Sequence, residues 1–140
     1  MKPKKEAIGR AVDQPDAKIR FYLFYGSDEG QSRGLAARLL EGLGASKALV
    51  PANALKSGAA SLADEASAMS LFGGTRLIWV EPAGEEIFDA VVALLDAPAP
   101  ESAVVAIAGG LRKTSALVKL AEGSPHALGF ASYPPEGRDA

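Results

Sequence analysis

Apolar residues in this chain alternate between short continuous runs and stretches where they recur every three or four positions. The continuous runs are rich in β-branched and aromatic residues and predict strands. The three- and four-residue spacings predict amphipathic helices. Strands are expected at 19–25, 48–52, 76–80, 103–108 and 127–132. Helices are expected at 6–12, at 57–69 and at 84–95. Two more are expected with a capping residue at their start: one capped by Ser27 or Asp28 and ended by Gly42 and Gly44, and one capped by Thr114 or Ser115 and ended at Gly123.

The order of these elements predicts the fold class. The run at 19–25 has almost no polar break, which is typical of a strand buried on both faces of a parallel sheet. The weaker run at 48–52 contains Pro51, which cannot donate to a strand ladder and so favours an edge position. A strand-helix alternation closed by a final strand predicts a three-layer α/β fold, with a mostly parallel five-stranded sheet between flanking helices.

Length and charge set the domain organisation. With 140 residues, 48% of them hydrophobic, one compact domain is expected. We expect a basic arm or short helix at 1–18, the α/β domain at 19–132, and the beginning of a linker at 133–140. The first twenty residues hold six basic and three acidic groups, while the chain as a whole has a net charge of −2. This arm could touch phosphate, although a solvated terminus is the favoured interpretation.

Few residues offer catalytic or metal-binding chemistry. The chain has no cysteine and one histidine, His126, which follows a Gly-Ser-Pro turn and is interpreted as a loop residue. Trp79 is expected in the core, and Glu81, followed by Pro82, is interpreted as part of a turn. We therefore expect no catalytic residue, no metal and no cofactor. No apolar run reaches the length of a membrane span and no secretory signal is present, which favours a cytoplasmic protein without a membrane partner.

The turn after the first strand occupies the place where a phosphate would bind in an α/β fold. A phosphate-binding loop of the G-x-x-x-x-G-K-[ST] kind needs a glycine, a lysine and a hydroxyl at positions that here hold Gln31, Ser32 and Arg33. Asp28 and Glu29 add negative charge. The loop is therefore interpreted as a degenerate phosphate loop that does not bind ATP; its residues are Gly26, Ser27, Asp28, Glu29, Gly30, Gln31 and Ser32.

A second stretch, Ser70-Leu71-Phe72-Gly73-Gly74-Thr75-Arg76, joins a predicted helix to a predicted strand. Residue types alone favour Leu71 and Phe72 in the core, because large apolar side chains are usually buried. The Gly-Gly pair makes a regular backbone improbable at this point, so the two side chains could instead be presented to a partner.

Four runs in this chain resemble the N-terminal domain of the delta subunit of the bacterial DNA polymerase III clamp loader. The most specific is Ser70-Leu71-Phe72-Gly73-Gly74-Thr75-Arg76-Leu77-Ile78. The others, in the family's order, are Phe21 to Glu29, Lys113 to Leu120, and Tyr133-Pro134-Pro135-Glu136. The resemblance implies an AAA+ ATPase-type domain that has lost ATP binding, which agrees with the interpretation of the loop after Gly26.

What the resemblance implies about function is a binding role in DNA replication. In that family a Leu-Phe wedge inserts into a hydrophobic pocket on the sliding clamp, the beta subunit, and promotes ring opening. That role passes to Leu71 and Phe72 here, with Met69, Ser70, Gly73 and Gly74 in support. The other clamp-loader subunits are implied as partners of the full-length protein, and primer-template DNA as an indirect one. The domain itself is expected to be non-catalytic, although the holoenzyme is a nucleotidyltransferase.

An enzyme remains the alternative interpretation. A divergent P-loop NTPase or a nucleotide-using transferase could use an unorthodox phosphate site at 26–32. The missing lysine argues against it, and nucleotide binding would discriminate between the two.

Overall fold

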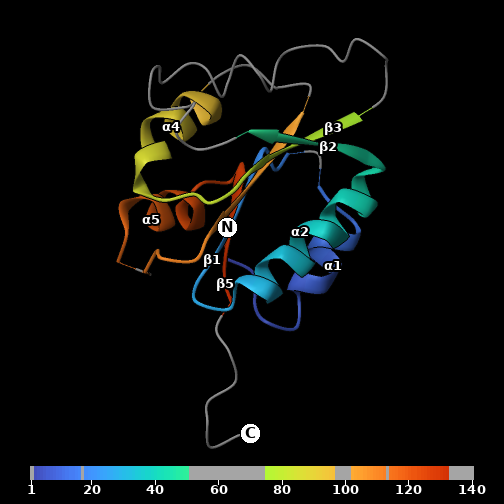
Figure 1. The fold of residues 1–140 in the computed structure, drawn as a ribbon, viewed down its shortest axis with the longest axis horizontal. Coiled ribbons are helices and arrows are strands. Elements are labelled where there is room, and N and C mark those ends of the chain that lie inside the picture. The colour runs from blue at the N-terminus through green and yellow to red at the C-terminus, as the bar shows by residue number, and fades with distance from the viewer. Residues whose placement is uncertain (1, 17, 51–74, 97–101, 113, 133–140) are drawn as a thin grey trace, which may run out of the picture.

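A computed structural model describes residues 2–16, 18–50, 75–96, 102–112 and 114–132. Within these ranges the chain forms one five-stranded sheet in the order β2-β3-β4-β1-β5, in which every neighbouring pair is parallel (Figure 1). The strands are β1 (Phe21–Tyr25), β2 (Ala45–Val50), β3 (Thr75–Val80), β4 (Ala103–Ala108) and β5 (Ala127–Ala131). The helix predicted at 57–69 lies outside the described residues.

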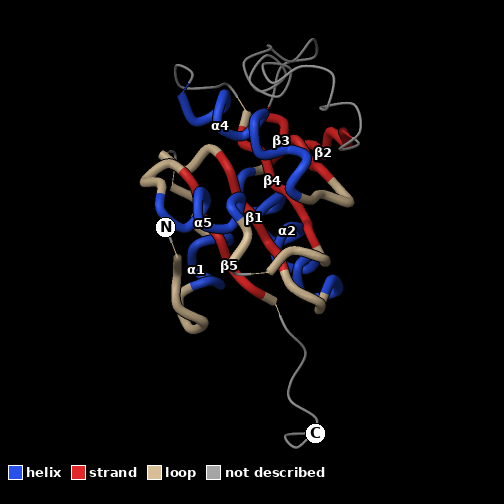
Figure 2. The backbone as a smooth tube through the Cα atoms, turned by 90° about the vertical axis from the view of Figure 1, so that its left-hand side faces the viewer, coloured by secondary structure: helices blue, strands red, loops and turns tan. Residues whose placement is uncertain are grey.

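Helices cover both faces of the sheet, so the predicted three-layer α/β architecture is confirmed. Helices α1 (Ile8–Asp13) and α2 (Glu29–Leu43) pack on one face; α4 (Phe88–Asp96), preceded by a 3-10 turn at Glu85–Ile87, and α5 (Ala116–Gly123) pack on the other. Figure 1 shows this separation, and Figure 2 shows the sheet from the side that α4 and α5 cover.

The apolar run of β1 is buried on both faces, as predicted. All five of its residues are buried. Phe21, Leu23 and Tyr25 belong to the core on the α4/α5 side, whereas Tyr22 and Phe24 belong to the core on the α1/α2 side. Successive side chains of a strand point to opposite faces, so β1 contributes to both cores.

The edge position of the second strand is also confirmed. Strand β2 pairs only with β3 among the described residues and ends the sheet. It begins at Ala45, three residues before the predicted start at residue 48. Its residues alternate between exposed and half-buried, a weaker pattern than that of the central strands.

The prediction that Gly42 contributes to the end of helix α2 is wrong. The helix continues through Gly42 to Leu43, and Gly44, with φ of +60°, forms its left-handed C-cap. A Cβ at Gly42 would lie 2.5 Å from the carbonyl oxygen of Val12. Gly42 therefore allows α1 to approach α2 closely, which buries Ile8 and Val12 of α1 in the core.

Because the strands are parallel, their carboxyl ends meet at one edge of the sheet. The loops after β1, β3 and β4 lie there together with Ser132, the residue after β5, and they carry the candidate site. Among the described helices, none has both the length and the apolar character that a membrane span requires.

Candidate functional site

The loop after β1 is held close to the end of β5. Gly26 has φ of +106°, and a Cβ at this position would lie 2.3 Å from the carbonyl oxygen of Ser132. The Gly26 N–H donates to the carbonyl of Ala108 at the end of β4, with an N···O distance of 3.4 Å. Only glycine combines this backbone conformation with so close an approach.

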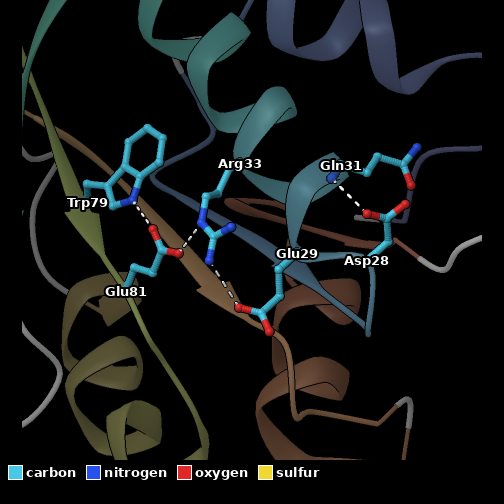
Figure 3. A network of polar contacts seen from close by, with 6 residues as sticks. All are labelled: Asp28, Glu29, Gln31, Arg33, Trp79 and Glu81. Carbon is cyan, nitrogen blue, oxygen red and sulfur yellow. Dashed lines mark hydrogen bonds and ion pairs between the residues drawn. The ribbon is translucent and has the colours of Figure 1, made fainter.

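Backbone N–H groups of this loop donate to the protein itself. The Asp28 N–H donates to the Ser132 carbonyl at 2.9 Å, and the Ser32 N–H donates to the Asp28 carbonyl at 3.1 Å. Asp28 is the N-cap of α2, where its carboxylate accepts a hydrogen bond from the Gln31 N–H at 3.0 Å (Figure 3). A phosphate at the start of α2 would have to compete with the Asp28 carboxylate for the Gln31 N–H, and with backbone carbonyls for the N–H groups of Asp28 and Ser32.

Glu29 carries a second carboxylate into the same place. Its side chain lies against the loop after β4, where a Cβ at Gly109 would fall 2.6 Å from the Glu29 carboxyl carbon. One Glu29 oxygen is 3.2 Å from a guanidinium nitrogen of Arg33, one helical turn further along α2. Glu29 therefore fills space beside Gly109 and faces Arg33.

Arg33 also binds the residue after β3. Its Nε is 2.5 Å from Oε2 of Glu81, and Oε1 of Glu81 accepts a hydrogen bond from the Trp79 indole N–H at 2.9 Å. Figure 3 shows the resulting chain of contacts from Trp79 through Glu81 and Arg33 to Glu29. The Lys47 ammonium lies 4.1 Å from the centroid of the Trp79 ring, so the chain of contacts extends to β2.

Electrostatics in this network favours an ionised Glu81. Partial burial acts to raise the pKa of Glu81, whose side chain is 18% exposed. Hydrogen bonds from Trp79 and Arg33 and the positive charges of Arg33 and Lys47 outweigh burial and hold the pKa of Glu81 below its usual value. Hydrogen bonding to Glu81 correspondingly raises the pKa of Arg33.

These contacts leave carboxylates where a nucleotide phosphate would need cations. Three acidic side chains, Asp28, Glu29 and Glu81, surround the start of α2, and Arg33 is engaged by two of them. The part of the chain that the structure describes holds no group of three or more His, Cys, Asp or Glu side chains arranged to hold a metal ion. The contacts of Arg33 with Glu29 and Glu81 instead connect α2 to the end of β3.

Three further residues singled out in the sequence are buried or half-buried. Trp79 is 4% exposed, which confirms its place in the core. His126 is half-buried in the loop before β5, where its Nδ1 is 3.2 Å from the Lys18 carbonyl oxygen. Ser32 of the loop is buried on the side of α2 that faces the sheet.

Sequence reasoning missed two long-range contacts near the site. The Arg33–Glu81 pair joins residues 48 positions apart, and no local spacing indicated it. Glu85, the first residue of the 3-10 turn before α4, accepts a hydrogen bond from the Leu117 N–H at 3.0 Å and one from the Ser115 hydroxyl. Ser115, one of the two predicted caps, is the N-cap of α5.

The predicted wedge lies outside the described residues. This applies to Leu71 and Phe72 and to the supporting residues Met69, Ser70, Gly73 and Gly74. The described chain resumes at Thr75, the first residue of β3.

Comparison of the sequence with models of known protein families gives no match, and comparison with curated proteins gives no match either.

Proposed function

We propose that this chain is the AAA+-type domain of a clamp-loader delta subunit, and that it acts by binding a sliding clamp through Leu71 and Phe72. In this proposal the domain neither binds nor hydrolyses ATP. The observation that carries the non-catalytic part is the Glu29–Arg33–Glu81 network at the start of α2.

The network supports a binding role because its side chains occupy the position where a phosphate would bind and there connect α2 to β3. Phosphate recognition in such loops depends on free backbone N–H groups and on a lysine. Here the N–H groups of Gly26, Asp28 and Ser32 donate to protein carbonyls. Arg33, in the first turns of α2, is paired with two carboxylates. A bound phosphate would therefore meet the carboxylates of Asp28, Glu29 and Glu81, while Arg33 is already paired with two of them.

The choice of partner rests on the run from Ser70 to Ile78. Its second part coincides with the start of β3, which begins at Thr75 and pairs with β2 on one side and β4 on the other. Leu77 and Ile78 are fully buried. A strand fixed on both sides supplies a firm base for a recognition loop that precedes it.

Two apolar anchors, together with a modest rim of weaker contacts, could support a specific contact of this kind. Full burial of a leucine and a phenylalanine contributes roughly 1.5–3 kcal/mol each. Interfaces commonly depend on a few such anchors surrounded by weaker contacts. If the wedge fits an open clamp interface better than a closed one, binding shifts the clamp toward opening without any bond being made or broken.

The test is a calorimetric titration of the same organism's sliding clamp with the parent domain and with L71A/F72A. Leu49→Ala is the matched control, because Leu49 is an apolar side chain that is 63% exposed on β2. Binding by the parent and by Leu49→Ala, with loss of binding in L71A/F72A, is the expected result. If the parent domain does not bind the clamp but does bind magnesium-ATP, the result supports the alternative interpretation, a nucleotide-using enzyme.

A further inference from the structure

The first ten residues form a basic surface that the clamp wedge does not use. Lys2, Lys4, Lys5 and Arg10 are all exposed. In the described part of the chain, the ion pairs that involve the first twenty residues are Lys18–Asp16 and Arg38–Asp13, so none includes these four cations. We call these four residues the basic segment.

The basic segment is anchored to the fold. The N–H groups of Ala7 and Ile8 both donate to the carbonyl of Lys4, at 2.9 and 3.1 Å, which joins the turn at Lys4 to α1. Helix α1 is in turn fixed to α2 by burial of Ile8 and Val12. The cations are therefore presented from a folded support.

Neighbouring acids neutralise little of this charge. Asp13 binds Arg38 through two contacts, at 3.0 and 2.5 Å, and hydrogen bonding to Arg38 holds the pKa of Asp13 below its usual value. Asp16 lies 4.0 Å from Lys18. Glu6 is the one carboxylate within residues 1–10. Four cations against one carboxylate leave a net charge of +3 on the side chains of these ten residues.

On the opposite face of the sheet, the 3-10 turn and α4 are acidic. Residues 85–96, which form the 3-10 turn and α4, contain no basic residue and four acids: Glu85, Glu86, Asp89 and Asp96. Helix α4 and α1 lie on different sides of the sheet (Figure 1). A polyanion would therefore be attracted to the basic segment and repelled from α4.

We propose that the basic segment contacts the phosphate backbone of a nucleic acid, without reading its sequence. A bilayer surface is the less suitable polyanion, because interfacial helices insert an apolar face and α1 has its two large apolar residues, Ile8 and Val12, buried against α2. Binding to a nucleic-acid backbone requires only exposed cations and is driven by counterion release. The inference does not depend on Leu71 and Phe72.

The experiment measures fluorescence anisotropy of a short labelled DNA duplex of mixed sequence during titration with the whole chain, at several salt concentrations. We expect a slope of about −3 to −4 for the logarithm of the association constant against that of salt, as four phosphate contacts would give. K4E/K5E should weaken binding about tenfold or more at low salt and bring the slope about two closer to zero. The matched control is R112E/K119E, which makes the same charge change at exposed residues near and on α5.

Near-parent DNA binding by R112E/K119E, together with the loss in K4E/K5E, supports the proposal. Equal losses in the two variants would show a net-charge effect and overturn it, as would no binding by the parent. Sedimentation with phosphatidylserine vesicles in the absence of DNA binding would also overturn it in favour of a membrane surface. Clamp binding by K4E/K5E should equal that of the parent, so failure here is distinguishable from failure of the proposed function.

Discussion

Arg33 on α2 and Glu81 at the end of β3 form an ion pair with an Nε–Oε2 distance of 2.5 Å. The pair joins the helix that follows the central strand β1 to the strand that follows the candidate wedge. Trp79, Glu81, Arg33 and Glu29 then form a continuous set of contacts across the carboxyl edge of the sheet (Figure 3). Loss of any one of these side chains should therefore weaken the connection between α2 and β3.

Glu81→Gln should destabilise the fold at neutral pH by about 1 kcal/mol, because the charge that faces Arg33 is lost. The pKa of Glu81 is lowered in the folded state, so its ionisation contributes stability that is fully present above the unfolded pKa, about 4.3. That contribution disappears as the pH falls through the lower folded pKa. Urea unfolding followed by fluorescence of Trp79, the one tryptophan in the chain, measures the difference. A gap between parent and variant that stays constant from pH 7 to pH 3 would contradict this account.

Gly26→Ala should destabilise the domain by at least about 2 kcal/mol, since the new Cβ would need both a positive φ and space occupied by the Ser132 carbonyl. Gly34→Ala is the control, and it should change the free energy of unfolding in the opposite direction. Gly34 is an exposed residue inside α2, and a Cβ added there would meet no atom within 4 Å, so alanine should stabilise the helix by about 0.5–1 kcal/mol. Denaturant midpoints of the two variants should move in opposite directions. A shared direction would argue against the described loop geometry.

Asp28→Ala should cost about 1 kcal/mol of stability, because the Gln31 N–H at the start of α2 loses its acceptor. Asp28→Asn should stay close to the parent, since asparagine caps helices about as well as aspartate. Thermal unfolding of the parent, Asp28→Ala and Asp28→Asn distinguishes the contribution of the capping hydrogen bond from that of the negative charge. Equal destabilisation by both substitutions would show that the negative charge, and not the cap, is what α2 requires at this position.

Magnesium-ATP should leave the melting temperature of the domain unchanged at millimolar concentration. A ligand present at a hundred times its dissociation constant adds about 2.7 kcal/mol to the folded state. In a domain of this size that corresponds to roughly 10 °C, well within the sensitivity of a thermal-shift measurement. A concentration-dependent rise with ATP would favour the nucleotide-using enzyme over the binding module.

Much of the fold was predictable because the strong signals are local. The apolar runs at 19–25 and 103–108 have the composition of buried parallel strands, and they form β1 and β4. Pro51 correctly indicated an edge strand, although the start of β2 at Ala45 has no marked apolar pattern. Cap residues were also informative, since Asp28 and Ser115 each begin a helix as predicted.

Contacts between distant segments could not be predicted. Gly42 resembles a helix terminator in the sequence, but its role depends on how closely α1 approaches α2. The strand order and the Arg33–Glu81 pair likewise depend on tertiary packing. The spacing of residues along the sequence does not indicate such packing. The sequence could show that the loop after Gly26 lacks a lysine and carries Asp28 and Glu29; the third carboxylate, that of Glu81, became apparent only in three dimensions.

The central claim is that Leu71 and Phe72 bind a sliding clamp, and calorimetric titration of the clamp tests it most directly. L71A/F72A should lose detectable binding while keeping the parent's circular dichroism spectrum and denaturant midpoint, and Leu49→Ala should bind like the parent. Unchanged affinity in a folded L71A/F72A protein would contradict the account.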